Sequence, residues 1–132
     1  MDIITKYPVE LLILLFLIVT FLQSGIDKLT DWKGNVSFIE DHFKHSPLKN
    51  GVPFLLGIIL ILEIVAALCM VYGIYEILSK GTSFYALIGI ELSALILIFL
   101  LIGQRLAKDY AGAMSLTVYF IVTILGLYAL IY

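Results

Sequence analysis

Residues 11–22 read LLILLFLIVTFL, an almost wholly apolar run without a single charge. The run extends over about residues 7–29, and a helix needs roughly 20 such residues to cross a hydrocarbon core about 30 Å thick. Similar runs follow at about residues 51–78, 83–104 and 110–132. Only helices and closed barrels satisfy their backbone hydrogen bonds in lipid, and the connections are short. The pattern therefore predicts an all-α membrane protein, an antiparallel bundle of four transmembrane helices forming one domain over residues 1–132.

The composition limits what the chain can bind. Of the 132 residues, 62% are apolar and 14% are charged, against about 25% charged in an average soluble domain, so the lipid bilayer is the first partner. The net charge of −2 provides no basic patch, and we expect no nucleic-acid binding. The single Cys69 cannot supply a thiol pair. The two histidines lie in one polar segment, which is unsuited to holding haem between transmembrane helices.

The connection between the first two spans, about residues 30–50, is the only long one. Ser37 and Glu40 match the S-x-x-E capping box and predict a short helix that begins there and ends at Pro47. Phe38, Ile39 and Phe43 are then expected on one side of it. Together with the nearby Trp32, these aromatic residues favour a position in the membrane interface. A compatible alternative is that they pack onto the bundle as a lid.

Basic residues predict the orientation. The connections after spans one and three carry six of them, and the opposite side carries Lys6 and Lys80. The six are Lys28, Lys33, Lys44, Lys49, Arg105 and Lys108. By the positive-inside rule these two connections are cytoplasmic and both termini are outside.

Two carboxylates interrupt the hydrocarbon-spanning runs, Glu63 in span two and Glu91 in span three. A central acidic side chain costs about 2.5–3.5 kcal/mol on insertion scales, so such groups usually face the bundle interior. A tight turn joins the two spans, and we expect both groups at similar depth, where they could share a proton. The functional interpretation is a proton relay or a polar contact to a quinone or lipid headgroup. The structural interpretation is an interhelical hydrogen bond that fixes register.

The end of span one, QSGIDKL, is the densest polar patch within any span. It contains Gln23, Ser24, Asp27 and Lys28, with Gly25 as a helix-packing position. The two charged residues could pair with charges in RLAKDY, residues 105–110. The alternative is a helix end that reaches the interface, with Lys28 extending its amine to water.

Span four carries small residues in place of charges. Ala111, Gly112 and Ser115 favour close helix packing, inside the bundle or with another protein, and we expect the first. His42 and His45 have a spacing that a metal could use on one helical face. Two imidazoles beside one carboxylate are a common combination, so no metal site is predicted. A pH-sensitive surface contact is the alternative.

Several of these features together resemble the DoxX family of small bacterial membrane proteins. They are the G-x-x-K-L of residues 25–29, the proline at the start of span two, Glu63 followed ten residues later by Gly73, and four spans in about 130 residues. The resemblance covers nearly the whole chain. Many members have an arginine early in span one, where this sequence is apolar from Leu11 to Val19. The resemblance implies a multi-pass protein of the bacterial cytoplasmic membrane, linked to respiratory or redox-associated complexes.

The sequence thus favours a non-catalytic accessory or structural subunit of a larger membrane protein complex, without a cofactor. This hypothesis depends on the lack of haem or metal ligands in the spans, of a thiol pair and of a soluble domain. The alternative is a small quinone-interacting redox protein that uses Glu63, Glu91 and the polar end of span one. A proton-coupled carrier is a third hypothesis, with no internal repeat or broken span to favour it.

Overall fold

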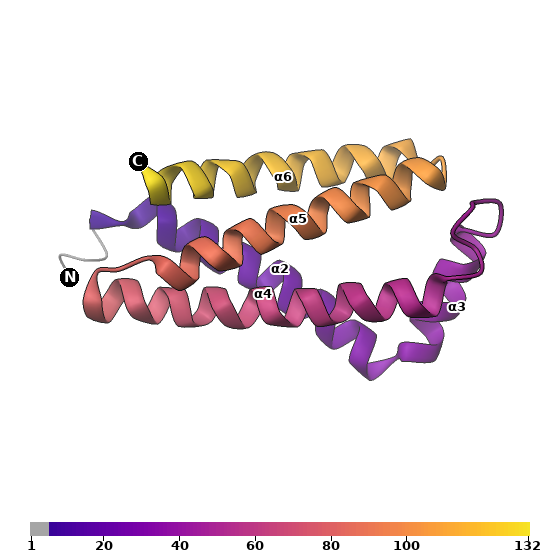
Figure 1. Ribbon diagram of the computed structural model, residues 1–132, viewed down its shortest axis with the longest axis horizontal. Coiled ribbons are helices and arrows are strands. Elements are labelled where there is room, and N and C mark those ends of the chain that lie inside the picture. The colour runs from indigo at the N-terminus through magenta and orange to yellow at the C-terminus, as the bar shows by residue number, and fades with distance from the viewer. Residues whose placement is uncertain (1–5) are drawn as a thin grey trace.

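The computed structural model describes residues 6–132, which form five helices and no strand (Figure 1). The helices are α2 (Pro8–Thr30), α3 (Trp32–His42), α4 (Val52–Lys80), α5 (Phe84–Leu106) and α6 (Tyr110–Ile131). All except α3 are long and apolar enough to cross a membrane. Their ends lie within two residues of the predicted spans. The prediction of a four-helix transmembrane bundle with a short helix after the first span is confirmed.

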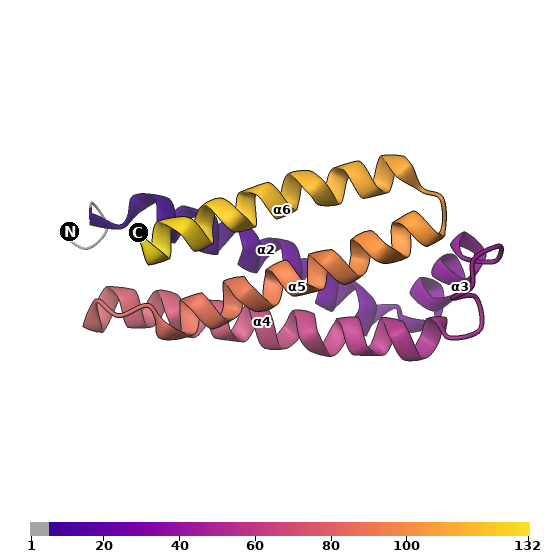
Figure 2. The ribbon, with the colours of Figure 1, turned by 45° about the horizontal axis from the view of Figure 1, so that its top comes forward.

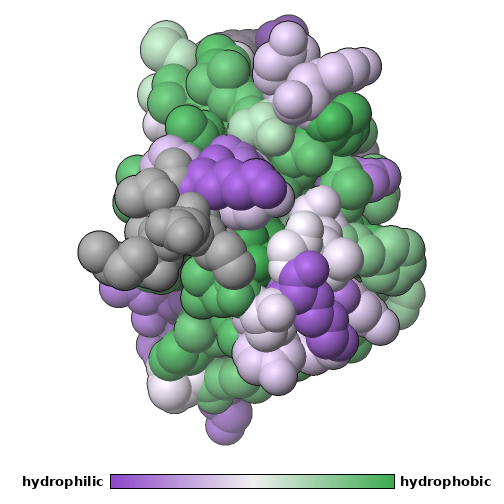
Figure 3. All heavy atoms as spheres, turned by 90° about the vertical axis from the view of Figure 1, so that its left-hand side faces the viewer, coloured by the Kyte–Doolittle hydropathy of each residue, from purple (hydrophilic) through white to green (hydrophobic). Residues whose placement is uncertain are grey.

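The four long helices form a ring in which each packs against two neighbours. α4 packs between α2 and α5, and α6 packs on α5 and on α2 (Figures 1 and 2). The carboxyl terminus and the turn between α4 and α5 lie at one end of the bundle, and α3 lies at the other. At the first end, hydrophilic residues stand among apolar ones (Figure 3). This is the surface expected where a membrane protein meets water.

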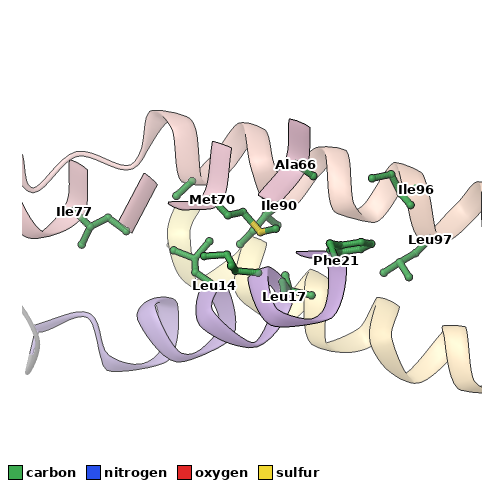
Figure 4. Close-up of a cluster of buried hydrophobic side chains, with 11 residues drawn as sticks. Leu14, Leu17, Phe21, Ala66, Met70, Ile77, Ile90, Ile96 and Leu97 are labelled. Atoms are coloured by element: carbon green, nitrogen blue, oxygen red, sulfur yellow. The ribbon is translucent and has the colours of Figure 1, made fainter. Parts of the chain in front are cut away.

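The core lies where α2, α4 and α5 meet. Leu14 and Leu17 of α2 are fully buried, and they point toward α4 and α5, which contribute Met70 and Ile90 (Figure 4). Phe21, Ala66, Ile77, Ile96 and Leu97 complete the labelled part of this cluster. In lipid, such contacts stabilise the bundle through close packing, because the surrounding acyl chains are as apolar as the core itself.

Two glycines bring the backbones of α4 and α5 together. A Cβ atom added at Gly73 would lie 2.5 Å from the backbone nitrogen of Ala86, and one at Gly89 would lie 2.5 Å from Cγ of Met70. Ser93, buried in the same contact, donates a hydrogen bond to the carbonyl oxygen of Gly89 at 2.7 Å. Small residues therefore determine how closely these helices approach, as in other membrane helix pairs.

The short helix α3 begins earlier than predicted. Its N-cap is Asp31, whose carboxylate accepts a hydrogen bond from the backbone nitrogen of Gly34 at 3.2 Å, so Ser37 and Glu40 lie inside the helix. It ends at His42, five residues before Pro47. The prediction of a capping box at Ser37 is wrong. Asp31 is the N-cap, because its side chain accepts the hydrogen bond from an amide of the first turn.

Candidate functional site

Lys28 and Glu63 form an ion pair between the end of α2 and the interior of α4. Lys28 Nζ lies 2.9 Å from Glu63 Oε1, and the side chains are only 12% and 3% exposed. The same ammonium group donates to Ser24 Oγ at 2.6 Å, one turn earlier on α2. Gly25 lies between them on the buried face of α2, where an added Cβ would be 3.5 Å from Ile64. That distance is an ordinary van der Waals contact, so the approach of α2 to α4 here does not depend on the glycine.

This pairing differs from the one expected from the sequence. Lys28 reaches Glu63 and not the RLAKDY segment, whose Asp109 pairs with His42 and whose Arg105 lies over the ring of Tyr110. Asp27 and Gln23 are exposed on the other side of α2. The polar end of span one is therefore divided between one buried pair and an outer polar surface.

Glu63 and Glu91, two carboxylates that could share a proton if they faced each other, do not lie together. Glu63 is buried, 2% exposed, while Glu91 lies on an exposed face of α5. The contacts at Gly73 and Gly89 place Glu91 level with about residues 66–68 of α4. Glu63 lies three to five positions away, or about 5–8 Å along the helix axis. Both residues fall within the spans, but they differ in depth and in the direction of their side chains.

A third carboxylate, that of Glu76, was not predicted to have a structural role. Glu76, 7% exposed near the end of α4, accepts a hydrogen bond from the backbone nitrogen of Tyr85 at 3.0 Å and one from Thr82 Oγ1 at 3.4 Å. It thereby satisfies a free amide in the first turn of α5. A carboxylate shortly before a tight turn that begins the next helix is the sequence signal that could have identified it.

His42 joins α3 to the ends of α5 and α6. Its Nε2 lies 3.0 Å from Gln104 Oε1 and 3.2 Å from Asp109 Oδ2. Asp109 is also the N-cap of α6, where it accepts from the backbone nitrogen of Gly112 at 2.8 Å. His45 is exposed and takes no part in this cluster. Within residues 6–132 no three His, Cys, Asp or Glu side chains are grouped so that they could hold a metal ion.

A cavity of about 430 Å³ lies beside this histidine, between α3, the beginning of α4 and the end of α5. His42 and Gln104 are the polar side chains in its wall, and the rest of the wall is apolar apart from Gly103. Gln104 was not singled out in the sequence, and Asp109 was considered only as a possible partner of charges in α2, because the contacts of both residues depend on where α3 lies.

The small residues of α6 behave in two ways. Gly112 is half-buried at the helix start, and an added Cβ there would lie 2.8 Å from Gln104 Nε2. Ala111 and Ser115 are exposed, so the packing inside the bundle that was predicted for them is not found. The small residues of α6 that do pack are Ala113, which is buried, and Gly126, where an added Cβ would lie 2.6 Å from Ile13 of α2.

Comparison of the chain with protein-family models, with curated proteins and with solved structures finds no match.

Proposed function

We propose that the protein is a non-catalytic accessory subunit of a larger membrane protein complex, and that it contacts its partner through the outer face of α5 around Glu91. The single observation that carries the proposal is the exposure of this carboxylate inside α5, a helix that is long and apolar enough to cross a membrane.

The depth of Glu91 follows from the packing of α4 and α5. Glu91 is level with about residues 66–68 of α4. Ala66 is the midpoint of α4. A rise of 1.5 Å per residue places Glu91 within about 3 Å of the middle of α4. The hydrocarbon core is about 30 Å thick, so this depth lies far from either headgroup region.

The surroundings of Glu91 differ from those of Glu63 and Glu76, the two acidic residues of α4. Glu63 is paired with Lys28, and Glu76 accepts hydrogen bonds at the start of α5. None of the ion pairs within residues 6–132 involves Glu91. An acidic side chain at this depth costs about 2.5–3.5 kcal/mol and normally pairs or faces a protein interior. A hydrogen-bond donor on a neighbouring transmembrane helix would supply the missing partner.

The rest of this face fits a helix contact. Ile88 and Leu95 lie one turn before and after Glu91 on the same side of α5, and both are exposed. A partner helix with an arginine, lysine, serine or asparagine at mid-depth could pack on the two apolar side chains and bind the carboxylate between them.

A non-catalytic role is supported by how the polar groups inside the bundle are used. Glu63 and Lys28 neutralise one another, and Glu76 serves a helix start, so each has a structural task. The DoxX resemblance supports the bacterial cytoplasmic membrane as the location and a respiratory or redox-associated complex as the partner.

The test is to tag the protein at its native locus, extract it in a mild detergent and identify what migrates with it on native electrophoresis. We expect the wild-type chain to comigrate with a larger complex and Glu91→Leu to run free. Glu40→Leu, which removes an exposed carboxylate from α3, is the matched control and should stay bound. The proposal fails if the wild-type chain runs alone, or if Glu91→Leu remains in the complex as fully as the control.

A further inference from the structure

We propose that the cavity beneath α3 binds one neutral membrane lipid of the acylglycerol class, with its hydroxyl-bearing head at His42 and its chain along α4 and α5. This site is separate from the face around Glu91.

The size and position of the cavity suit part of a lipid chain. Its volume of about 430 Å³ falls within the roughly 300–1,000 Å³ typical of small-molecule sites. On α5 the wall extends from Phe99 to Leu106, which corresponds to about 10 Å along the helix. The cavity therefore begins at the α3 end of the bundle and extends about a third of the way into a hydrocarbon core of roughly 30 Å.

The wall is suited to a chain over most of its length. It consists largely of aliphatic and phenylalanine side chains from α4, α5 and the segment that contains α3. Ile39 and Phe43 close the cavity from the α3 side, and Phe43 Cζ would lie 3.6 Å from a Cβ atom added at Gly103. α3 thus covers an apolar hollow that the two long helices leave open at this end.

His42 makes the polar end selective for a hydroxyl group. A carboxylate oxygen only accepts, so the contact of Nε2 with Asp109 makes this nitrogen the donor. In the neutral imidazole Nδ1 is then an acceptor, and no side-chain hydrogen bond within residues 6–132 uses it. A lipid hydroxyl can donate to this nitrogen.

The charges around the cavity disfavour an anionic head. The wall contains no lysine or arginine, and the Asp109 carboxylate lies 3.2 Å from the imidazole. A phosphate or a fatty-acid carboxylate at His42 would face this negative charge without a cation in the wall. A neutral head meets no such repulsion.

The experiment uses the full chain in phosphatidylcholine vesicles and a monoacylglycerol with a photoreactive diazirine in its chain. After illumination we expect one label per chain, on residues 52–59 or 99–106. Unlabelled monoacylglycerol should displace it and an alkane of equal length should not. A fatty acid with the same chain and diazirine should label several-fold less.

Two variants test the two ends of the site. Gly103→Phe fills the cavity and should abolish labelling, whereas Leu125→Phe on an exposed face of α6 should leave it unchanged. His42→Phe keeps an aromatic ring beside Phe38 but removes the polar contact, and it should reduce labelling by the monoacylglycerol several-fold.

Equal labelling by the fatty acid and the monoacylglycerol would overturn the proposal, and so would labelling spread evenly over the outer faces of the helices. If Gly103→Phe does not fold, the competition with unlabelled lipid on the wild-type chain still decides the question.

Discussion

The ion pair between Lys28 and Glu63 holds α2 against α4 at a point where both side chains are largely buried. Side chains that are 12% and 3% exposed have lost most of their hydration, so each charge depends on the other for stabilisation. Ser24 completes the coordination of the ammonium group. The pair therefore fixes both the rotation of α2 and its position along α4.

Removing one partner should destabilise the fold more than removing both. Lys28→Met leaves the Glu63 carboxylate buried and uncompensated, and we expect it to lower the free energy of unfolding by about 3–5 kcal/mol. The double variant Lys28→Met/Glu63→Leu leaves no charge behind and should recover most of this loss. Reversible unfolding in mixed micelles measures both values.

Lys33→Met, which removes an exposed lysine of α3, is the control and should unfold like the wild-type chain. A Lys28→Met variant as stable as this control would show that the pair contributes nothing to stability.

The residues of this pair could be identified from the sequence, but their pairing could not. Lys28 and Glu63 both stand out as charges in apolar surroundings, which is a local property of the chain. Which faces of two helices meet depends on how each helix is rotated about its axis. A helix that is apolar nearly all round has no distinct apolar face, so its sequence does not indicate this rotation. For the same reason the sequence left open whether Glu91 faces Glu63, and the structure places Glu91 on an outer face.

At the scale of elements, the contact between α4 and α5 is the closest approach of two backbones in the bundle that involves glycine. A Cβ at Gly73 would meet backbone atoms of Ala86 at 2.5 and 2.6 Å, and a backbone cannot move aside as a flexible side chain can. In the sequence, Gly73 stood out only through a family resemblance. Its close neighbour Ala86 belongs to the next helix, so their contact cannot be seen from the residues around Gly73.

Gly73→Ala should therefore force the two helices apart. We expect a loss of about 1–3 kcal/mol, the usual cost of overpacking. Gly57→Ala is the matched control in the same helix, since the nearest atom to its Cβ is 3.9 Å away in Trp32. Alanine favours a helix over glycine by roughly 0.5–1 kcal/mol, so the control should be neutral or stabilising. Thermal unfolding measures the stability of both variants. An equal change in stability for Gly73→Ala and Gly57→Ala would contradict the prediction.

Helix ends show a different limit of sequence analysis. The four long spans were predicted to within two residues because hydropathy runs are long and their ends carry proline, glycine or charge. α3 was placed about five residues too late, since Asp31 and Ser37 are both acceptable N-caps and nothing local separates them. Its position over the cavity depends on His42 and Asp109, which are 67 positions apart in the chain.

The whole molecule has two chemically different ends. Lys28 is engaged with Glu63, so five basic residues remain at the α3 end against Lys6 and Lys80 at the end with the carboxyl terminus. The five are Lys33, Lys44, Lys49, Arg105 and Lys108. The positive-inside rule therefore still predicts that α3 is cytoplasmic.

Cysteine labelling in intact cells tests this orientation. In a Cys69→Ala background, Thr82→Cys should react with a membrane-impermeant maleimide added from outside, and Asn50→Cys should react only after the cells are permeabilised. Both positions are exposed and uncharged, so neither substitution alters the balance of basic residues. The reverse pattern would place both termini in the cytoplasm.

The ion pair of α2 and α4 also bears on how the chain enters the membrane during synthesis. Lys28 and Glu63 are 35 positions apart, and at roughly 5–20 residues per second the ribosome needs about 2–7 s to proceed from one to the other. During this interval Lys28 has no counter-charge, and its long side chain can keep the ammonium group at the aqueous boundary. Glu63 then arrives within a strongly apolar span. The first helix can therefore enter lipid before the second, and the two charges neutralise one another only when α4 packs beside α2.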